Sequence, residues 1–171
     1  MLQPYSISID ENGIATFTAD NKAIYKALFV GIPSPEPQLE GLIFDFTFER
    51  DAANCDNTIH PGHDARIKPT LERIINRFFE LAPDGILYFS CDSTDGRHRE
   101  RLFIFNKWHV PHEAEVTKVP FCIAGGSTDS GEDLPDTVGG AFFLKSHPFH
   151  NMVEDFIKSE IIIYTSAKTV T

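Results

Sequence analysis

The chain has 171 residues, of which 42% are hydrophobic and 23% are charged, a length and composition typical of one globular domain. Its formal net charge is −10, and because nucleic-acid binders need a phosphate-neutralising surface, a nucleic-acid partner is not expected. No stretch reaches the ~18 uninterrupted apolar residues of a membrane helix, so membrane insertion is not expected either.

The N-terminal residues and the cysteines indicate a cytoplasmic protein. "MLQPYSISIDENG" has neither a basic segment nor an apolar segment of the kind that directs secretion. Cys55, Cys91 and Cys122 are an odd number without close pairs, a pattern that favours reduced thiols over disulfides.

The first fifty residues predict four strands. Apolar and polar residues alternate over 5–9, 14–18 and 23–30, and the turn-forming clusters "DENG" and "ADNK" separate these runs. The segment 41–50, "GLIFDFTFER", alternates again. We therefore expect an antiparallel meander at the start of the fold.

The next ordered segment, 66–82, is predicted to be a helix. Pro69 is tolerated only in the first helical turn, so the helix should begin near Lys68. A single stripe at helical spacing carries its apolar residues, namely Ile67, Leu71, Ile74, Ile75, Phe78 and Phe79. The segment 86–91, "ILYFSC", is apolar on both sides and predicts a central strand covered on each face.

The second half of the chain predicts two helices and three strands. The helices are expected over 97–110 and 148–159, and the strands over 114–125, 138–147 and 160–169. This order predicts one α+β domain, 1–171, with a mixed, mostly antiparallel twisted sheet and helices on both faces. The fourth and the last strand are expected at edges, where a second copy could pair to form a homodimer.

The order of elements resembles the GCN5-related N-acetyltransferase fold, in which a meander precedes a strand, a cofactor-binding helix and a second strand. The segment "IHPGHDARIKPTLERII", 59–75, is similar to that family's V-x-P-x-x-R/Q-x-x-G-x-G/A motif, with Ile59 and Pro61 matching V-x-P. The resemblance implies an acetyltransferase-like fold, in which helix N-terminal amides hold the pyrophosphate of acetyl-CoA.

The motif is nevertheless degenerate in this chain. Its basic position falls on Asp64, whose charge opposes a pyrophosphate, and its glycine positions fall on Ile67 and Pro69. Pro69 also removes an amide donor. We therefore expect no cofactor, with acetyl-CoA as the alternative.

A second resemblance is to a family of short bacterial proteins that carry C-D-S-x-D-G-R after a strand and F-N-R/K-W at the end of the next helix. It covers 66–108 and 139–158. The matching residues are Cys91, Asp92, Ser93, Asp95, Gly96, Arg97, Phe105, Asn106, Lys107 and Trp108. This resemblance supports the fold and implies no activity.

The turn after 86–91 is the candidate binding site. Amides that follow Gly96 could hold a phosphate or a carboxylate at a helix N-terminus, together with nearby arginines. Two acidic residues could hold these arginines or accept a proton, or could simply cap the helix. The candidate residues are Asp92, Asp95, Gly96, Arg97, Arg99 and Arg101.

Two histidine pairs, His60 with His63 and His147 with His150, could bind zinc if their loops met. Recognised ligand spacings are absent, so no metal is expected. A carboxylate beside Cys91 raises a thiol pKa, and Cys122 is expected to be inert within an apolar strand.

Three functions remain. The leading hypothesis is a non-enzymatic binding module for a protein or a small anionic ligand, centred on 92–101. The second is an acyl-CoA-dependent N-acyltransferase with an altered cofactor loop, with Asp45, Glu49 or Asp92 as the base. The third is a metal-dependent hydrolase built on the two histidine pairs.

Overall fold

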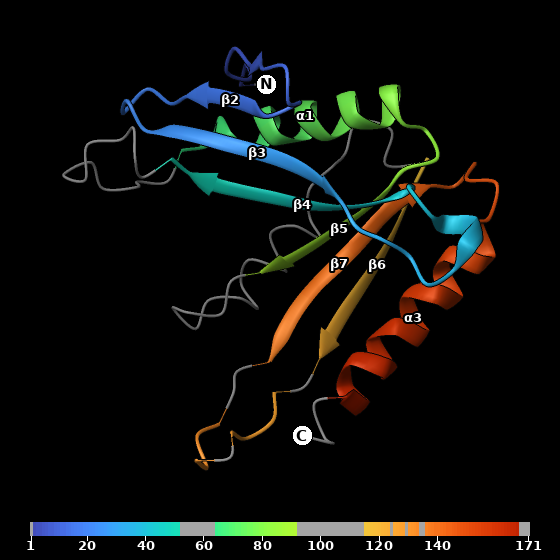
Figure 1. The fold of residues 1–171 in the computed structure, drawn as a ribbon. Helices are drawn as coiled ribbons and strands as arrows, with labels where there is room; N and C mark the ends of the chain where they lie inside the picture. Colours follow the sequence, from blue (N-terminus) through green and yellow to red (C-terminus); the bar gives the residue numbers. More distant parts are fainter. Residues whose placement is uncertain are drawn as a thin grey trace.

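The computed structural model describes residues 2–51, 64–91, 115–123, 125–128, 130–133 and 136–167. In the described part, seven strands form one sheet, accompanied by two α-helices and a short 3-10 helix (Figure 1). The strands are β1 (Ser8–Ile9), β2 (Ala15–Thr18), β3 (Ile24–Gly31), β4 (Ile43–Arg50), β5 (Ile86–Cys91), β6 (Val116–Ile123) and β7 (Thr137–Leu144). The helices are η1 (Pro37–Leu39), α1 (Ile67–Leu81) and α3 (His150–Ala167).

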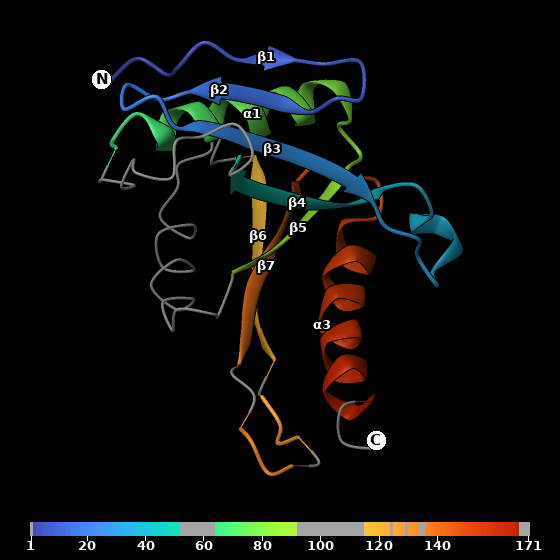
Figure 2. The same ribbon diagram turned by 60° about the vertical axis from the view of Figure 1, so that its left-hand side comes forward.

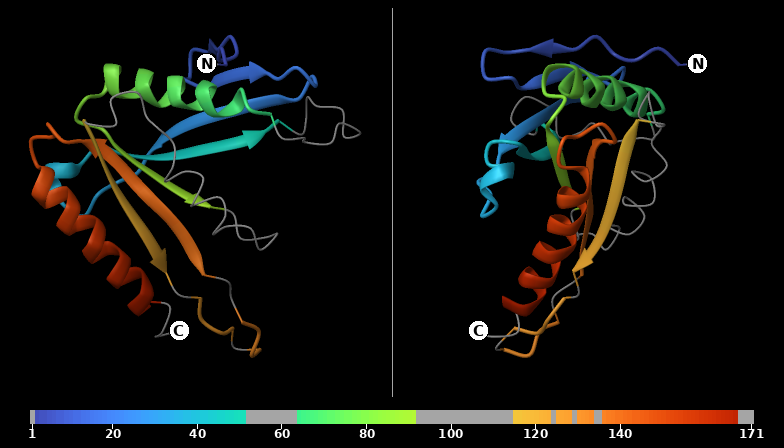
Figure 3. Two further views of the ribbon diagram at one scale, coloured as in Figure 1. Left: turned by 180° about the vertical axis from the view of Figure 1, so that it is seen from behind. Right: turned by 90° about the vertical axis from the view of Figure 1, so that its right-hand side faces the viewer.

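The sheet has the strand order β1-β2-β3-β4-β5-β7-β6. Neighbouring strands pair antiparallel, except that β4 and β5 are parallel. Figures 2 and 3 show the consequence of its twist: β2, β3 and β4 cross the molecule, whereas β6 and β7 run steeply away from them beside α3. The predicted α+β class and the mixed sheet are confirmed.

Among the described residues, the buried side chains form two clusters. The first joins α1 to β2–β7, and its α1 residues are the predicted ones, Leu71, Ile74, Ile75, Phe78 and Phe79. The second joins α3 to β4–β7 through Val153 and Ile157. Strand β5 serves both, with Leu87 and Phe89 in the first cluster and Ile86 in the second, because successive side chains of a strand point to opposite faces.

Two consecutive glycines let β7 approach its neighbours. A Cβ atom at Gly139 would collide with the carbonyl oxygen of Phe89 and with the ring of Phe121. At Gly140 it would lie 2.9 Å from the ring of Phe89. The aromatic rings of Phe89 and Phe121 therefore depend on the absence of side chains at these two positions of β7.

Three predictions on the C-terminal half and the sheet edges are wrong. Residues 160–167 continue α3 instead of forming a strand, and this helix begins at His150, not at 148. β4 is internal, because β5 pairs with it on the side away from β3. Cys122 lies in β6 as expected and is exposed, and its inertness stays a prediction.

Within the described residues, no helix combines the length and the apolarity needed to cross a membrane. The predicted helix over 97–110 lies outside the described residues.

Candidate functional site

The candidate site lies where the parallel strands β4 and β5 end. Their pairing covers three residue pairs, from Ile43↔Ile86 to Asp45↔Tyr88. β4 continues to Arg50 beside β3, and β5 continues to Cys91 beside β7. The two strands thus separate toward their carboxyl ends, as Figure 1 shows. In open sheets, ligands bind outside the carboxyl ends of parallel strands, so this opening is the natural candidate.

The α1 side of the opening is apolar. Phe46, on β4, and Phe89 and Cys91, on β5, are 6%, 3% and 5% exposed and belong to the α1 cluster. The ring of Phe89 packs against that of Phe142 with centroids 4.9 Å apart. These side chains are core residues, and they give this side of the opening an apolar, uncharged surface.

The opposite side of the opening carries polar groups. Asp45 is half-buried and is the register partner of Tyr88 in the last pair before the strands separate. The Thr47 hydroxyl donates to Asp45 Oδ2 at 3.2 Å. Of the three proposed bases, Asp45 therefore lies at the junction, Glu49 is exposed further along β4, and Asp92 lies outside the described residues.

An ion pair fixes the end of β4. Lys26 Nζ, on β3, lies 2.8 Å from Asp51 Oδ2, whose side chain is 6% exposed. The hydrogen bond to Asp51 raises the pKa of Lys26 above its usual range. The Asp51 amide donates to the carbonyl oxygen of Ile24 at 2.8 Å. The Asp51 amide therefore makes the last hydrogen bond of the β3–β4 ladder, and its carboxylate is paired with Lys26.

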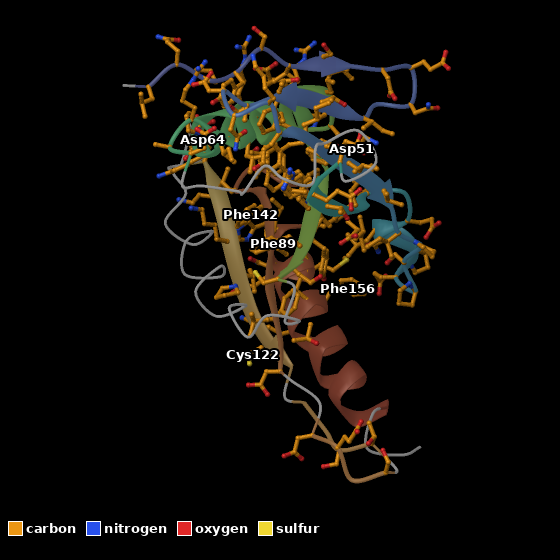
Figure 4. The ribbon with its side chains drawn as sticks, turned by 90° about the vertical axis from the view of Figure 1, so that its left-hand side faces the viewer. Asp51, Asp64, Phe89, Cys122, Phe142 and Phe156 are labelled. Atoms are coloured by element: carbon orange, nitrogen blue, oxygen red, sulfur yellow. The ribbon has the colours of Figure 1, made fainter. Side chains whose placement is uncertain are left out.

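The N-terminus of α1, where the resemblance would place a pyrophosphate, is occupied by Asp64. Figure 4 shows Asp64 and Asp51 at a similar height, on opposite sides of the view. Asp64 Oδ1 accepts a hydrogen bond from the Arg66 amide at 2.9 Å, and its carbonyl oxygen accepts one from the Ile67 amide at 3.2 Å. Pro69 has no amide hydrogen. Few backbone amides of the first turn are thus left to bind an outside anion, and the negatively charged Asp64 carboxylate lies beside them.

Tyr5 holds this carboxylate in place. Its hydroxyl donates to Asp64 Oδ2 at 2.7 Å and accepts a hydrogen bond from the Asp20 amide at 3.0 Å. Its own amide donates to Thr70 Oγ1 at 2.9 Å. Burial of the ring, followed by the hydrogen bond to Asp64, raises the pKa of Tyr5 above its ordinary value.

The nearby cation, Arg66, is engaged as well. Its Nε donates to the carbonyl oxygen of Gln3 at 2.9 Å, and its Nη1 lies 3.2 Å from both carboxylate oxygens of Asp20. The guanidinium lies 3.9 Å from the centre of the Tyr5 ring. Arg66 therefore ties the N-terminal segment to α1 and is not directed at a ligand.

The residues that sequence reasoning selected are only partly covered by the structure. Asp92, Asp95, Gly96, Arg97, Arg99 and Arg101 lie outside the described residues and follow Cys91, the last residue of β5, in the chain. His60, His63 and Cys55 are likewise outside. The Tyr5–Asp64 contact was missed, because no sequence signal links residues 59 positions apart.

The second histidine pair is part of the packing. His147 is 4% exposed; its Nδ1 accepts the Phe149 amide at 3.1 Å, so Nε2 carries the proton and donates to the Asp84 carbonyl oxygen at 3.1 Å. His150 Nε2 lies 2.9 Å from Thr117 Oγ1. The described ranges contain no group of three or more His, Cys, Asp or Glu residues that could hold a metal ion.

No protein-family model, curated protein or solved structure matches the chain. Its function therefore has to be inferred from the geometry of its own residues.

Proposed function

We propose that the chain is a non-enzymatic binding module built on an acetyltransferase-like architecture whose cofactor position is closed. The observation that carries this proposal is Asp64: its carboxylate accepts the amide of Arg66, the residue before α1, its carbonyl oxygen accepts the first helical amide, that of Ile67, and Tyr5 fixes it there. Coenzyme A does not fit this helix N-terminus, because its pyrophosphate would meet a carboxylate and a proline in place of free amides.

The sheet topology supports the architecture. A meander of β1–β4 leads through α1 into β5, which is parallel to β4, and β7 is inserted between β5 and β6. The separation of β4 from β5 after three pairs matches an acetyltransferase-like opening. That α1 and α3 belong to different core clusters supports helices on both faces of the sheet.

The centre of binding is the 92–101 turn, which follows β5 in the chain. Its three arginines could hold an anion where the N-terminus of α1 does not, since Arg97, Arg99 and Arg101 can pair with carboxylate or phosphate groups. Asp92 and Asp95 would orient these arginines. The partner is accordingly a protein or a small ligand that presents anionic groups.

A thermal-shift titration with acetyl-CoA tests the closed cofactor position. A ligand at a hundred times its dissociation constant stabilises a protein by about 2.7 kcal/mol, which is a shift of several degrees for a chain of this size. We expect no shift at millimolar acetyl-CoA, with desulfo-coenzyme A and ADP as controls. A saturable shift specific to acetyl-CoA would overturn the proposal.

The turn itself is tested by variants that keep the fold. The Arg97→Ala/Arg101→Ala variant should lose binding to an immobilised anionic peptide library, while its melting temperature stays unchanged. The matched control removes two cations elsewhere, Lys68→Ala/Lys145→Ala, and should bind as the unaltered protein does. Equal binding by all three proteins would show that the turn is only a helix cap.

The second candidate is an N-acyltransferase. One observation favours it: Asp45 lies at the last β4–β5 pair, where the strands separate and a base would be needed. Acetyl-CoA stabilisation that persists in Asp45→Asn, together with loss of acetyl transfer to a panel of amines, would establish this activity in place of the first.

A further inference from the structure

A second concave site lies away from the β4–β5 opening. A groove of about 750 Å³ runs between the β1–β2 hairpin and the second half of α1, a volume within the range of small-molecule sites. We call it the hairpin groove. It includes Phe44, near the start of β4, and Leu81, the last residue of α1. It is therefore at the opposite end of α1 from Asp64.

The floor of the hairpin groove is aromatic. Phe29 and Phe78 stack with centroids 4.8 Å apart, and Phe44 meets Phe78 edge-on at 5.1 Å. Two large apolar side chains of its wall, Ile9 and Leu81, are 57% and 68% exposed. Exposed apolar residues that flank an apolar groove are characteristic of a binding surface.

The rim of the hairpin groove is positively charged. Arg73 and Arg77 lie one helical turn apart on α1, and both line the groove. Arg77 Nη1 donates to Glu80 Oε2 at 2.6 Å, which offsets its charge. Arg73 has no ion pair anywhere in the described residues. Among its described residues, the rim thus holds one uncompensated cation, in a chain of net charge −10.

We propose that the hairpin groove binds a free long-chain carboxylic acid, with the alkyl chain over the phenylalanine floor and the carboxylate on the guanidinium of Arg73. An apolar floor with a single cation at its rim matches a ligand with one apolar body and one anionic head. An added β-strand is a poorer occupant, because the adjacent edge strand, β1, is two residues long.

Competition for a fluorescent probe tests the proposal with the full chain. Dansyl-labelled undecanoate is titrated first, and then displaced by dodecanoate or by dodecyltrimethylammonium, each below its micelle concentration. The two competitors share the tail and differ in the sign of the head. We expect saturable probe binding that dodecanoate reverses at a concentration at least about tenfold lower, since the cationic head meets Arg73.

Substitutions at exposed positions then separate head from tail. Arg73→Gln should weaken dodecanoate binding by about fivefold, the size of one exposed ion pair. Leu81→Glu should abolish it, because the new carboxylate lies in the apolar wall. Lys68→Gln, which removes a cation of α1 outside the groove, is the control and should bind normally. All three should melt as the unaltered protein does.

The opposing results are equally definite. Absence of saturable probe binding, or displacement by the two competitors at equal concentrations, would overturn the proposal. So would equal weakening by Arg73→Gln and Lys68→Gln, which would reduce the effect to the general charge of α1.

Discussion

Removal of the Tyr5 hydroxyl is the sharpest test of the closed α1 N-terminus. Tyr5→Phe keeps the ring, which is 5% exposed and stacks on Phe17 with centroids 5.8 Å apart. It deletes the hydrogen bonds to Asp64 Oδ2 and from the Asp20 amide. A bond to a carboxylate contributes about 1.5–3 kcal/mol and a neutral one about 0.5–1.5 kcal/mol.

Water can reach these partly buried groups and replace part of both bonds, so we expect a loss of about 2 kcal/mol. For a chain of this size, that loss lowers the melting temperature by about 4–8 °C. Urea unfolding followed by circular dichroism gives the free energy directly. Ser6→Ala, which removes a hydroxyl from an exposed neighbour, is the control and should change stability by less than about 0.5 kcal/mol.

A double-mutant cycle shows whether the lost energy belongs to this pair. Asp64→Asn retains an oxygen that can accept the Arg66 amide but loses the charge beside Tyr5. Combined with Tyr5→Phe, it should reveal a coupling of about 1 kcal/mol. Tyr5→Phe at wild-type stability, or a coupling near zero, would refute the conclusion that Tyr5 holds Asp64 at the helix N-terminus.

The same contact makes a prediction about alkaline pH. Burial and the hydrogen bond to Asp64 raise the pKa of Tyr5 above 10.0 in the folded chain. The unfolded chain therefore releases this proton first, and stability falls as the pH rises above about 10. Tyr5→Phe lacks the group, so its stability should fall less steeply over the same range in urea titrations. Parallel declines would contradict the assigned environment of Tyr5.

Two further substitutions test the packing. Gly139→Ala places a Cβ atom against the Phe89 carbonyl oxygen and should cost about 3 kcal/mol of stability or prevent folding. The control, Gly126→Ala, has nothing within 4 Å of the new atom and should leave stability unchanged. Expression level and urea unfolding measure both variants. His147→Ala leaves the Asp84 carbonyl oxygen without its buried donor and should cost about 2–3 kcal/mol of stability. Mass spectrometry should find the same zinc content as in the unaltered protein. A loss of bound zinc would instead support the metal hypothesis.

The local elements could be predicted because their signals are local. The alternation over 41–50 and the helical stripe from Leu71 to Phe79 are visible in any window of the sequence. The closing strand was predicted wrongly because "EIIIYTS" is rich in β-branched residues, which favour strands. It follows Ser159 without a glycine or a proline, however, so nothing interrupts the helix that began at His150.

The candidate site depends on long-range placement, which is why so little of it could be predicted. Alternation marked β4 as a strand but could not show that it pairs with β5 in parallel, and so it was assigned to an edge. The motif comparison identified Asp64 as a mismatch. Only the structure shows that its carboxylate is bonded by the hydroxyl of Tyr5, from the other end of the meander.

The short β4–β5 ladder is the weakest backbone connection between the two halves of the sheet, β1–β4 and β5–β7. Three parallel pairs join the two halves, whereas β3 and β4 share seven pairs and β5 and β7 share five. α1 bridges this seam, because its cluster includes Phe46 on one side and Phe89 and Phe142 on the other. The side-chain packing of α1 therefore stabilises the short β4–β5 pairing. In native-state hydrogen exchange, loosening of α1 should therefore expose the β4–β5 amides before those of either half.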